Sequence, residues 1–272
     1  MRPQVRAVAR GLRPVRRTVR RLRHEQPLTL IGWHRIDDRH TDGLSTTEAG
    51  FERHLDLLEE RGARVLPLME AVERLALGSL PSRAVALTFD DGYASVVETA
   101  WPMLRKRDMP ATLFVCSEYL PGTARFDWDT RESIHERHRL ATAQQVADAH
   151  AEGLDIGSHT RTHPWLPALD DRALERELVE SREVIGDLLR APVRSLAYPT
   201  GGWDRRVRAA AARAGYTAAV TVSKGTNRRR THPLSLHRAF VPEETDDLDL
   251  LLDGAYGFLR PVDAVRRPRE VS

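Results

Sequence analysis

The sequence predicts a single α/β domain in which a parallel sheet closes as a barrel, and three observations favour this fold. Apolar runs of strand length alternate with helical patterns about seven times along the chain. The length of 272 residues is common for one such barrel. The apolar run at residues 84–89 ends in Asp90, Asp91 and Gly92, and α/β barrels present catalytic groups at the C-terminal tips of their strands.

The first half of the domain is expected to contribute four strands. Residues 28–35 are an apolar run that ends at His34 and Arg35. Ser45 and Glu48 have the spacing of a capping box, which predicts the start of the next helix. The further strands are expected at 64–68, 84–89 and 111–116, and the further helices at 69–77 and 94–107.

The second half begins with a long connection, residues 118–140, and loops of this length at a barrel mouth often line the substrate cleft. Thr142 and Gln145 predict another helix start. The remaining strands are expected at 154–157, 193–198, 217–222 and 234–241, and the remaining helices at 169–189, 203–214 and 246–259.

The adjacent acids Asp90 and Asp91 can take different roles because neighbouring side chains point in different directions. One carboxylate can bind a metal while the other stays free as a base. The alternative is a pair of acids that only cap the next helix.

Two histidines, His159 and His163, stand four residues apart in the segment SHTRTHP, just beyond the apolar run 154–157. With a carboxylate they would give an Asp-His-His ligand set that leaves positions open for water and substrate. Together, TFDDG and SHTRTHP resemble the motifs of the polysaccharide deacetylase family, the metal-dependent carbohydrate esterases that remove N-acetyl groups from amino sugars. The resemblance covers residues 28–241, and the predicted fold is a distorted (β/α)7-type barrel.

The resemblance implies that Asp91, His159 and His163 bind the metal and that Asp90 is the general base. These ligand types fit zinc best, and they also accommodate cobalt, nickel, iron or manganese. A free carboxylate beside the metal-activated water can take its proton.

The third motif of the family, Arg-x-Pro-Tyr/Phe-Gly, corresponds here to the run AYPTG at residues 197–201. The proline and glycine are present, and the backbone N–H of Thr200 would donate to the developing oxyanion. The motif arginine is replaced by Ala197, and three other residues are candidates for its role, namely Arg35, Arg161 and Arg238. The alternative for AYPTG is a plain turn from strand to helix.

Two histidines compete for the role of general acid. The family commonly uses a histidine in Leu-x-His near the C-terminus, but in LSLHR His237 is displaced by one position. The start of the domain, LIGWHRI, resembles the branch that includes the poly-N-acetylglucosamine deacetylases, in which this strand has moved to the N-terminus. That resemblance favours His34 as general acid over His237, and a structural role for His34 is the remaining alternative.

Residues 1–27 form an arginine-rich arm, which precedes the barrel at 28–260 and a charged tail at 261–272. Nine arginines fall within the first 23 residues, and the first acid is Glu25. The apolar residues of the arm recur at helical spacing, although Pro14 is expected to interrupt a helix. This pattern indicates a segment that lies on an anionic membrane or binds nucleic acid, and the alternative is a solvated arm. Because no signal peptide or membrane-spanning segment is recognised, we expect a cytoplasmic location.

The sequence contains a single cysteine, Cys116, which lies in an apolar run, and one cysteine cannot form an internal disulfide.

From the motifs described above we expect a metal-dependent carbohydrate N-deacetylase whose partner is an N-acetylated carbohydrate. The alternative is a carbohydrate-binding protein on the same barrel without activity, which would not need a base beside a metal. No specific nucleic-acid partner is expected, because the domain lacks interleaved aromatic and basic residues. The sequence does not determine the oligomeric state.

Overall fold

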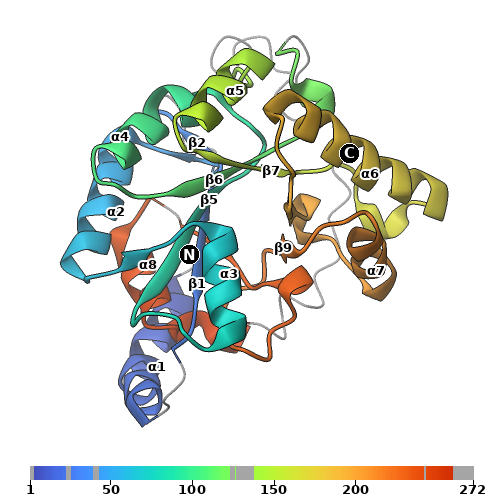
Figure 1. The fold of residues 1–272 in the computed structure, drawn as a ribbon. Coiled ribbons are helices and arrows are strands. Elements are labelled where there is room, and N and C mark those ends of the chain that lie inside the picture. Colours follow the sequence, from blue (N-terminus) through green and yellow to red (C-terminus); the bar gives the residue numbers. More distant parts are fainter. Residues whose placement is uncertain are drawn as a thin grey trace.

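The structure is a computed structural model that describes residues 3–22, 26–38, 43–122, 126, 138–241 and 243–259. A curled parallel sheet with the strand order β10-β1-β5-β6-β7-β8-β9 forms the centre, and β4 pairs with the start of β5. Helices surround the sheet, and the whole is a distorted (β/α)7-type barrel (Figure 1). The strands are β1 (Thr29–Trp33), β4 (Arg64–Val65), β5 (Ala84–Phe89), β6 (Ala111–Val115), β7 (Asp155–Ser158), β8 (Ser195–Ala197), β9 (Ala218–Val220) and β10 (Ala239–Phe240).

The helices connect successive strands, as parallel pairing requires. A separate two-stranded sheet, β2 (Arg35–Ile36) with β3 (Ser45–Thr46), follows β1. The α-helices are α1 (Pro3–Leu22), α2 (Glu48–Glu60), α3 (Leu68–Leu77), α4 (Trp101–Arg105), α5 (Ala143–Ala151), α6 (Asp171–Leu189), α7 (Arg205–Arg213) and α8 (Thr245–Leu252). The shorter helical turns are η1 (Val96–Ala100), η2 (Ser117–Tyr119), η4 (Leu166–Ala168), η5 (Pro199–Gly201), η6 (Pro233–Ser235) and η7 (Ala255–Leu259).

The last strand of the barrel differs from the single strand expected at 234–241. Leu236 pairs with Val220 of β9, and only three residues later Ala239 pairs with Ile31 of β1. The chain must therefore change its pairing partner within this segment, which divides it into the turn η6, one bridge at Leu236 and the short β10. This segment joins the two edges of the curled sheet.

The strands alternate between two apolar clusters. In β5, Val85, Leu87 and Phe89 pack in the larger cluster with the outer helices, whereas Ala84 and Ala86 pack in a smaller one. The smaller cluster also contains the buried face of α3, together with residues from the starts of β1 and β9. Helix α3 thus packs against this smaller cluster and contacts β5 (Figure 1).

Several predicted helix boundaries were wrong. The N-cap of α2 is Thr47, which accepts from the Gly50 N–H, whereas Ser45 belongs to β3. The predicted helix 94–107 begins as the π-helical turn η1, because Pro102 has no N–H to donate to the preceding turn. The predicted closing helix 246–259 is interrupted at Gly254, where φ is 69°. The capping box at Thr142 and Gln145 is confirmed.

The arginine-rich segment is a helix that packs against the C-terminal part of the chain. Helix α1 continues through Pro14, contrary to expectation, and contacts α8 and η7. Arg6 binds the fully buried Asp247 at 2.9 Å, and Arg13 binds Asp249 and Asp253 at 2.5 Å each. These contacts hold the helix although the proline removes one of its backbone hydrogen bonds. Part of the basic charge of the arm is therefore neutralised by the chain itself.

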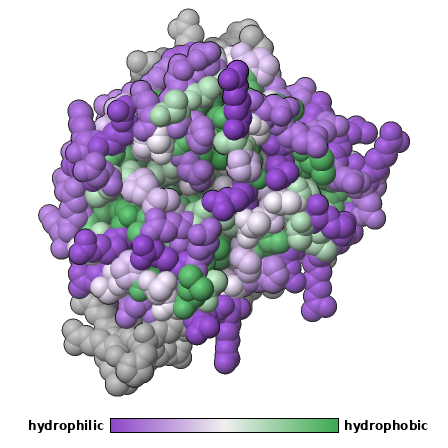
Figure 2. All heavy atoms as spheres, viewed as in Figure 1, coloured by the Kyte–Doolittle hydropathy of each residue, from purple (hydrophilic) through white to green (hydrophobic). Residues whose placement is uncertain are grey.

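The described surface carries few exposed apolar side chains. In the view of Figure 2, hydrophilic residues dominate and apolar residues lie in small, separate groups. The large apolar residues exposed among those described are Val8, Leu77 and Val184. No helix within the described ranges is long and apolar enough to cross a membrane.

Candidate active site

The sequence motifs meet at the C-terminal edge of the sheet. Asp90 and Asp91 follow β5, and His159 and His163 follow β7, the second strand along. Thr200 follows β8, and His34 follows β1. The parallel order of the strands brings these loops to one edge because all strands end on the same side.

Asp91, His159 and His163 form a cluster with the geometry of a metal site. One ligand atom from each residue lies within 4.8 Å of the others. The Asp91 Oδ1 atom is 3.4 Å from His159 Nε2 and 3.6 Å from His163 Nε2. The three donors thus converge on one point, and a carboxylate with two imidazoles is a donor set that suits a divalent transition metal.

The orientation of His159 fits metal binding. Its Nδ1 atom lies 2.8 Å from the carbonyl oxygen of Ala197, so Nδ1–H donates there and Nε2 is the ring nitrogen that faces Asp91. Ala197 stands at the position of the motif arginine, and its backbone therefore contributes to the site although its side chain cannot. No pattern in the sequence indicates this contact.

The electrostatics of the cluster follow from its burial. Burial lowers the pKa of His159, but the carboxylates of Asp90 and Asp91 outweigh this effect and raise it above the usual value. Burial and the neighbouring His159 lower the pKa of His163 to about 4. Burial would raise the pKa of Asp91, but the hydrogen bond from His159 and the nearby imidazoles hold it well below its usual range. Asp91 is therefore ionised and His163 neutral at pH 7, the forms that bind a metal, whereas the raised pKa of His159 means that a bound metal would have to displace its second proton.

Four residues of these loops have positive φ angles, although none is glycine. The values are 70° for Asp91, 68° for Thr160, 64° for His163 and 51° for Thr200. Such left-handed conformations cost on the order of 1 kcal/mol each and occur at functional sites where the surroundings enforce them.

Asp90 is bound by Arg238 in a buried, bidentate ion pair. Arg238 Nη1 donates to Oδ1 and Nη2 to Oδ2, each at 2.6 Å. The guanidinium also lies 4.7 Å from the centre of the Phe240 ring. Burial would raise the pKa of Asp90, but Arg238 holds it below its usual value.

Of the three arginines considered for the missing motif residue, only Arg238 contacts Asp90. Arg35 lies over the Tyr93 ring and donates to Ser45. Arg161 pairs with the exposed acids Glu118 and Glu180. Arg238 precedes β10 and therefore reaches Asp90 from the segment that joins the edges of the sheet.

His34 and His237 lie at different heights in the barrel. The His34 ring stacks on Phe240 with 4.2 Å between ring centres. Burial lowers the pKa of His34, and the charges of Asp91 and Asp90 offset this only in part. His237 is bound through its backbone to Asn227, which pairs with Leu28 before β1 begins. The pairing of Ala239 with Ile31 puts His237 level with Thr29, five residues or roughly 16 Å before His34.

Thr200 occupies a tightly packed turn. Its hydroxyl donates to the Pro199 carbonyl at 2.8 Å. A Cβ atom on Gly201 would lie 2.3 Å from Val222, and one on Gly202 would lie 2.2 Å from the Trp165 ring. The turn therefore has little freedom to move.

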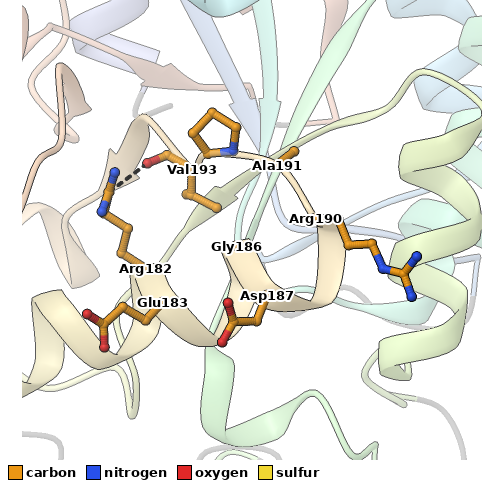
Figure 3. Close-up of a pocket in the computed structure, with 8 residues that line it drawn as sticks. Arg182, Glu183, Gly186, Asp187, Arg190, Ala191 and Val193 are labelled. Atoms are coloured by element: carbon orange, nitrogen blue, oxygen red, sulfur yellow. Dashed lines mark hydrogen bonds between the residues drawn. The ribbon is translucent and has the colours of Figure 1, made fainter.

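Other predicted features lie away from the Asp91, His159 and His163 cluster or outside the described residues. Cys116 is buried, and its thiol donates to the His159 carbonyl at 3.2 Å. Of the connection 118–140, residues 123–125 and 127–137 lie outside the described part, as does the tail 261–272. A separate surface pocket at the C-terminal end of α6, where Arg182 donates to the Val193 carbonyl, contains none of the predicted site residues (Figure 3).

The comparison with protein families agrees with this geometry. The model of the polysaccharide deacetylase family matches residues 78–219, which include both motifs. The chain belongs to the polysaccharide deacetylase family. Among its relatives, YxkH of Bacillus subtilis is 28% identical over 223 residues, which are 81% of this chain and 74% of YxkH.

Further deacetylases connect the chain with the branch predicted from LIGWHRI. The poly-beta-1,6-N-acetyl-D-glucosamine N-deacetylase of Escherichia coli is 28% identical over 134 residues, 48% of this chain but only 20% of that protein. The corresponding enzyme of Staphylococcus epidermidis is 25% identical over 58% of this chain and 54% of its own length. The chain thus spans from a fifth to about half of these longer relatives.

Solved structures of deacetylases share the fold. Streptococcus pyogenes PplD, in complex with acetate, has a TM-score of 0.72 at 22% identity and covers 84% of this chain and 99% of its own. IcaB from Ammonifex degensii has a TM-score of 0.71 at 22% identity and covers 85% of this chain and 97% of its own. The distorted barrel and the family branch predicted from the sequence are confirmed.

Proposed function

We propose that the chain is a metal-dependent hydrolase that removes N-acetyl groups from an amino sugar or from its oligomer or polymer. The observation that carries the proposal is the juxtaposition of two groups with separate roles. Asp91, His159 and His163 converge as one ligand set, and beside them Asp90 is held ionised by Arg238. A hydrolase that uses a metal-activated water needs both a place for the cation and a base next to it.

The cation is proposed to be zinc, with cobalt, nickel, iron or manganese as alternatives of the same ligand preference. A divalent ion at this position supplies Lewis acidity, which polarises the acetyl carbonyl and makes a water molecule more acidic. The ionised Asp91 and the neutral His163, together with His159 oriented by the Ala197 carbonyl, would hold it.

Asp90 is proposed to accept the proton of the attacking water. Arg238 occupies one lone pair on each carboxylate oxygen, so each oxygen keeps a further site that can accept a proton. The water oxygen forms the new C–O bond to the acetyl carbon, and the amide C–N bond then breaks. The backbone N–H of Thr200 would donate to the oxygen that becomes negatively charged between these steps.

His34 is proposed to give the departing nitrogen its proton, so that the products are acetate and a free amine. Asp90 and Asp91 favour the protonated imidazole, which burial otherwise disfavours. His34 also stacks on Phe240, whose ring lies under the guanidinium of Arg238. The acid and the residue that holds the base would therefore be supported by the same ring.

The substrate class is proposed from the relatives, which are named for N-deacetylation of poly-beta-1,6-N-acetyl-D-glucosamine. The test is to incubate the purified, zinc-loaded chain with β-1,6- and β-1,4-linked N-acetylglucosamine oligomers and with N-acetylglucosamine. We expect free acetate, and a mass loss of one acetyl group in at least one oligomer series, at a rate that falls by on the order of a hundredfold or more in the Asp90→Asn variant. Binding of an oligomer without acetate release would support the non-catalytic alternative and contradict the proposal.

A further inference from the structure

Helix α6 carries a buried acid that has no role in the chemistry described above. Glu177 is 7% exposed and lies on the same face of α6 as the buried Leu174, Leu178 and Ser181. An acid on the buried face of an amphipathic helix is uncommon unless a partner satisfies its charge. Glu177 finds its partners in the loop that contains the two histidines.

The carboxylate of Glu177 binds three donors of that loop. Its Oε2 atom accepts the backbone N–H of Arg161 at 2.8 Å and that of Thr162 at 2.9 Å. Its Oε1 atom accepts the hydroxyl of Thr162 at 2.6 Å. Arg161 and Thr162 stand between His159 and His163 in sequence, so Glu177 holds the middle of the segment that supplies two ligands.

A second contact from α6 supports the start of the same loop. The hydroxyl of Ser181, one turn after Glu177, lies 3.0 Å from the hydroxyl of Ser158. The Ser158 hydroxyl in turn accepts the backbone N–H of Thr160 at 3.1 Å. The hydroxyl of Thr160 in turn accepts the backbone N–H of His163 at 3.1 Å. Two residues of one helix thus hold the loop, directly and through Ser158.

These contacts stand where the loop needs external support. Thr160 and His163 have φ angles of 68° and 64°, conformations that side-chain-bearing residues rarely adopt without it. Without the bonds to Glu177, Arg161 and Thr162 could leave this arrangement and carry the His163 imidazole away from Asp91.

We propose that Glu177 is a positioning residue that holds the loop 159–163 in its metal-binding conformation before the ion arrives. The inference rests on the metal site proposed above. Because a preformed site avoids the entropic cost of ordering its ligands, removal of Glu177 should weaken metal binding as well as turnover. The effect comes from the hydrogen bonds, so an amide at this position should preserve most of it.

The experiment measures zinc affinity of the metal-free full chain by competition with a chromogenic chelator. Glu177→Ala should bind zinc about ten- to a hundredfold more weakly, the usual effect of losing a residue that orients a ligand. Glu177→Gln should stay close to the unsubstituted chain, because its carbonyl oxygen can accept both backbone N–H groups. Glu180→Gln is the matched control, since Glu180 is on the same helix and pairs with two side chains, those of Arg161 at 3.5 Å and Arg176 at 3.8 Å, rather than with the loop backbone.

A second measurement needs no variant and holds even if Glu177→Ala fails to fold. In the metal-free chain, the amide hydrogens of Arg161 and Thr162 should exchange slowly, because Glu177 already binds them. Fast exchange there, equal zinc affinity in Glu177→Ala, or an equal loss in Glu180→Gln or Glu177→Gln would overturn the inference. If instead His163→Ala binds zinc as well as the unsubstituted chain, the proposed metal site itself fails.

Discussion

The two halves of the candidate active site are built from different parts of the chain. The proposed ligands come from two short motifs. Asp91 follows β5, and the two histidines, His159 and His163, follow β7; only β6 separates these two strands in the sheet. Asp90, by contrast, is held by Arg238, which is 148 residues away in sequence. His34 and Phe240 likewise meet from opposite ends of the domain.

The difference has a physical origin. A ligand set needs only two loops at the correct distance, which β5 and β7 provide because the spacing of parallel strands in one sheet is fixed. The pair of Asp90 and Arg238 needs the barrel to close, because Arg238 lies in the segment that leaves β9 and joins β1. The ligand half therefore depends on local loop structure, and the base half depends on the closure of the whole domain. The two halves should respond differently to substitution.

The largest effect is expected in the ligand half. His163→Ala should lose most of the bound metal and reduce turnover to background, because one of three protein ligands is removed. Metal content by atomic emission and acetate release measure the two quantities. Chelation of the unsubstituted chain should abolish turnover, and added zinc should restore it. Full metal occupancy in His163→Ala would show that the ion binds elsewhere.

The next effect separates the two adjacent acids. Asp90→Asn should keep its metal yet lose turnover by on the order of a hundredfold or more, the usual contribution of a positioned base. Asp91→Asn should lose metal and activity together. The two variants are isosteric with the parent residues and adjacent in sequence, so each is the control for the other. Equal metal content in both variants would contradict the division between ligand and base.

A smaller effect is expected from the residue that joins the base to the closure of the barrel. Arg238→Lys keeps a positive charge but cannot form the bidentate pair, and turnover should fall by about tenfold. Because Arg238 lowers the pKa of Asp90, its loss should raise that pKa. The acidic limb of the pH–rate profile should therefore move to higher pH. Arg161→Lys is the control, and an equal shift in that variant would refute the role of Arg238.

The same division explains what the sequence could predict. TFDDG and SHTRTHP predict the ligand half because their residues are close in sequence and follow apolar strands, and the structure brings these residues together. The partner of Asp90 stayed open among three arginines, since no local pattern gives the pairing of β10 with β1. The N-cap of α2 was predicted at Ser45, two residues before Thr47. The Thr47 N–H donates to the carboxylate of Glu243, which belongs to a distant loop, and a local pattern does not reveal this contact. Glu177 was missed, although an acid within the apolar stripe of α6 could have indicated a buried partner.

The last prediction concerns the acid, where the expected effect depends on the substrate. If His34 protonates the departing nitrogen, it must be cationic while Asp90 is ionised, and the pH–rate profile should be bell-shaped. Its alkaline limb should report His34, whose pKa burial lowers. His34→Ala should remove this limb without changing the metal content.

His34→Ala should cost much less on an acetyl ester with a good phenol leaving group than on an N-acetyl sugar, because a phenolate leaves without a proton. His237→Ala is the control, and it should change little on either substrate because its backbone is bound near the start of β1. Acetate release from both substrates by both variants measures the four rates. If His237→Ala showed the selective loss while His34→Ala was mild, the acid would come from the segment before β10. The acid and Arg238, which holds the base, would then be adjacent in sequence and come from the same segment.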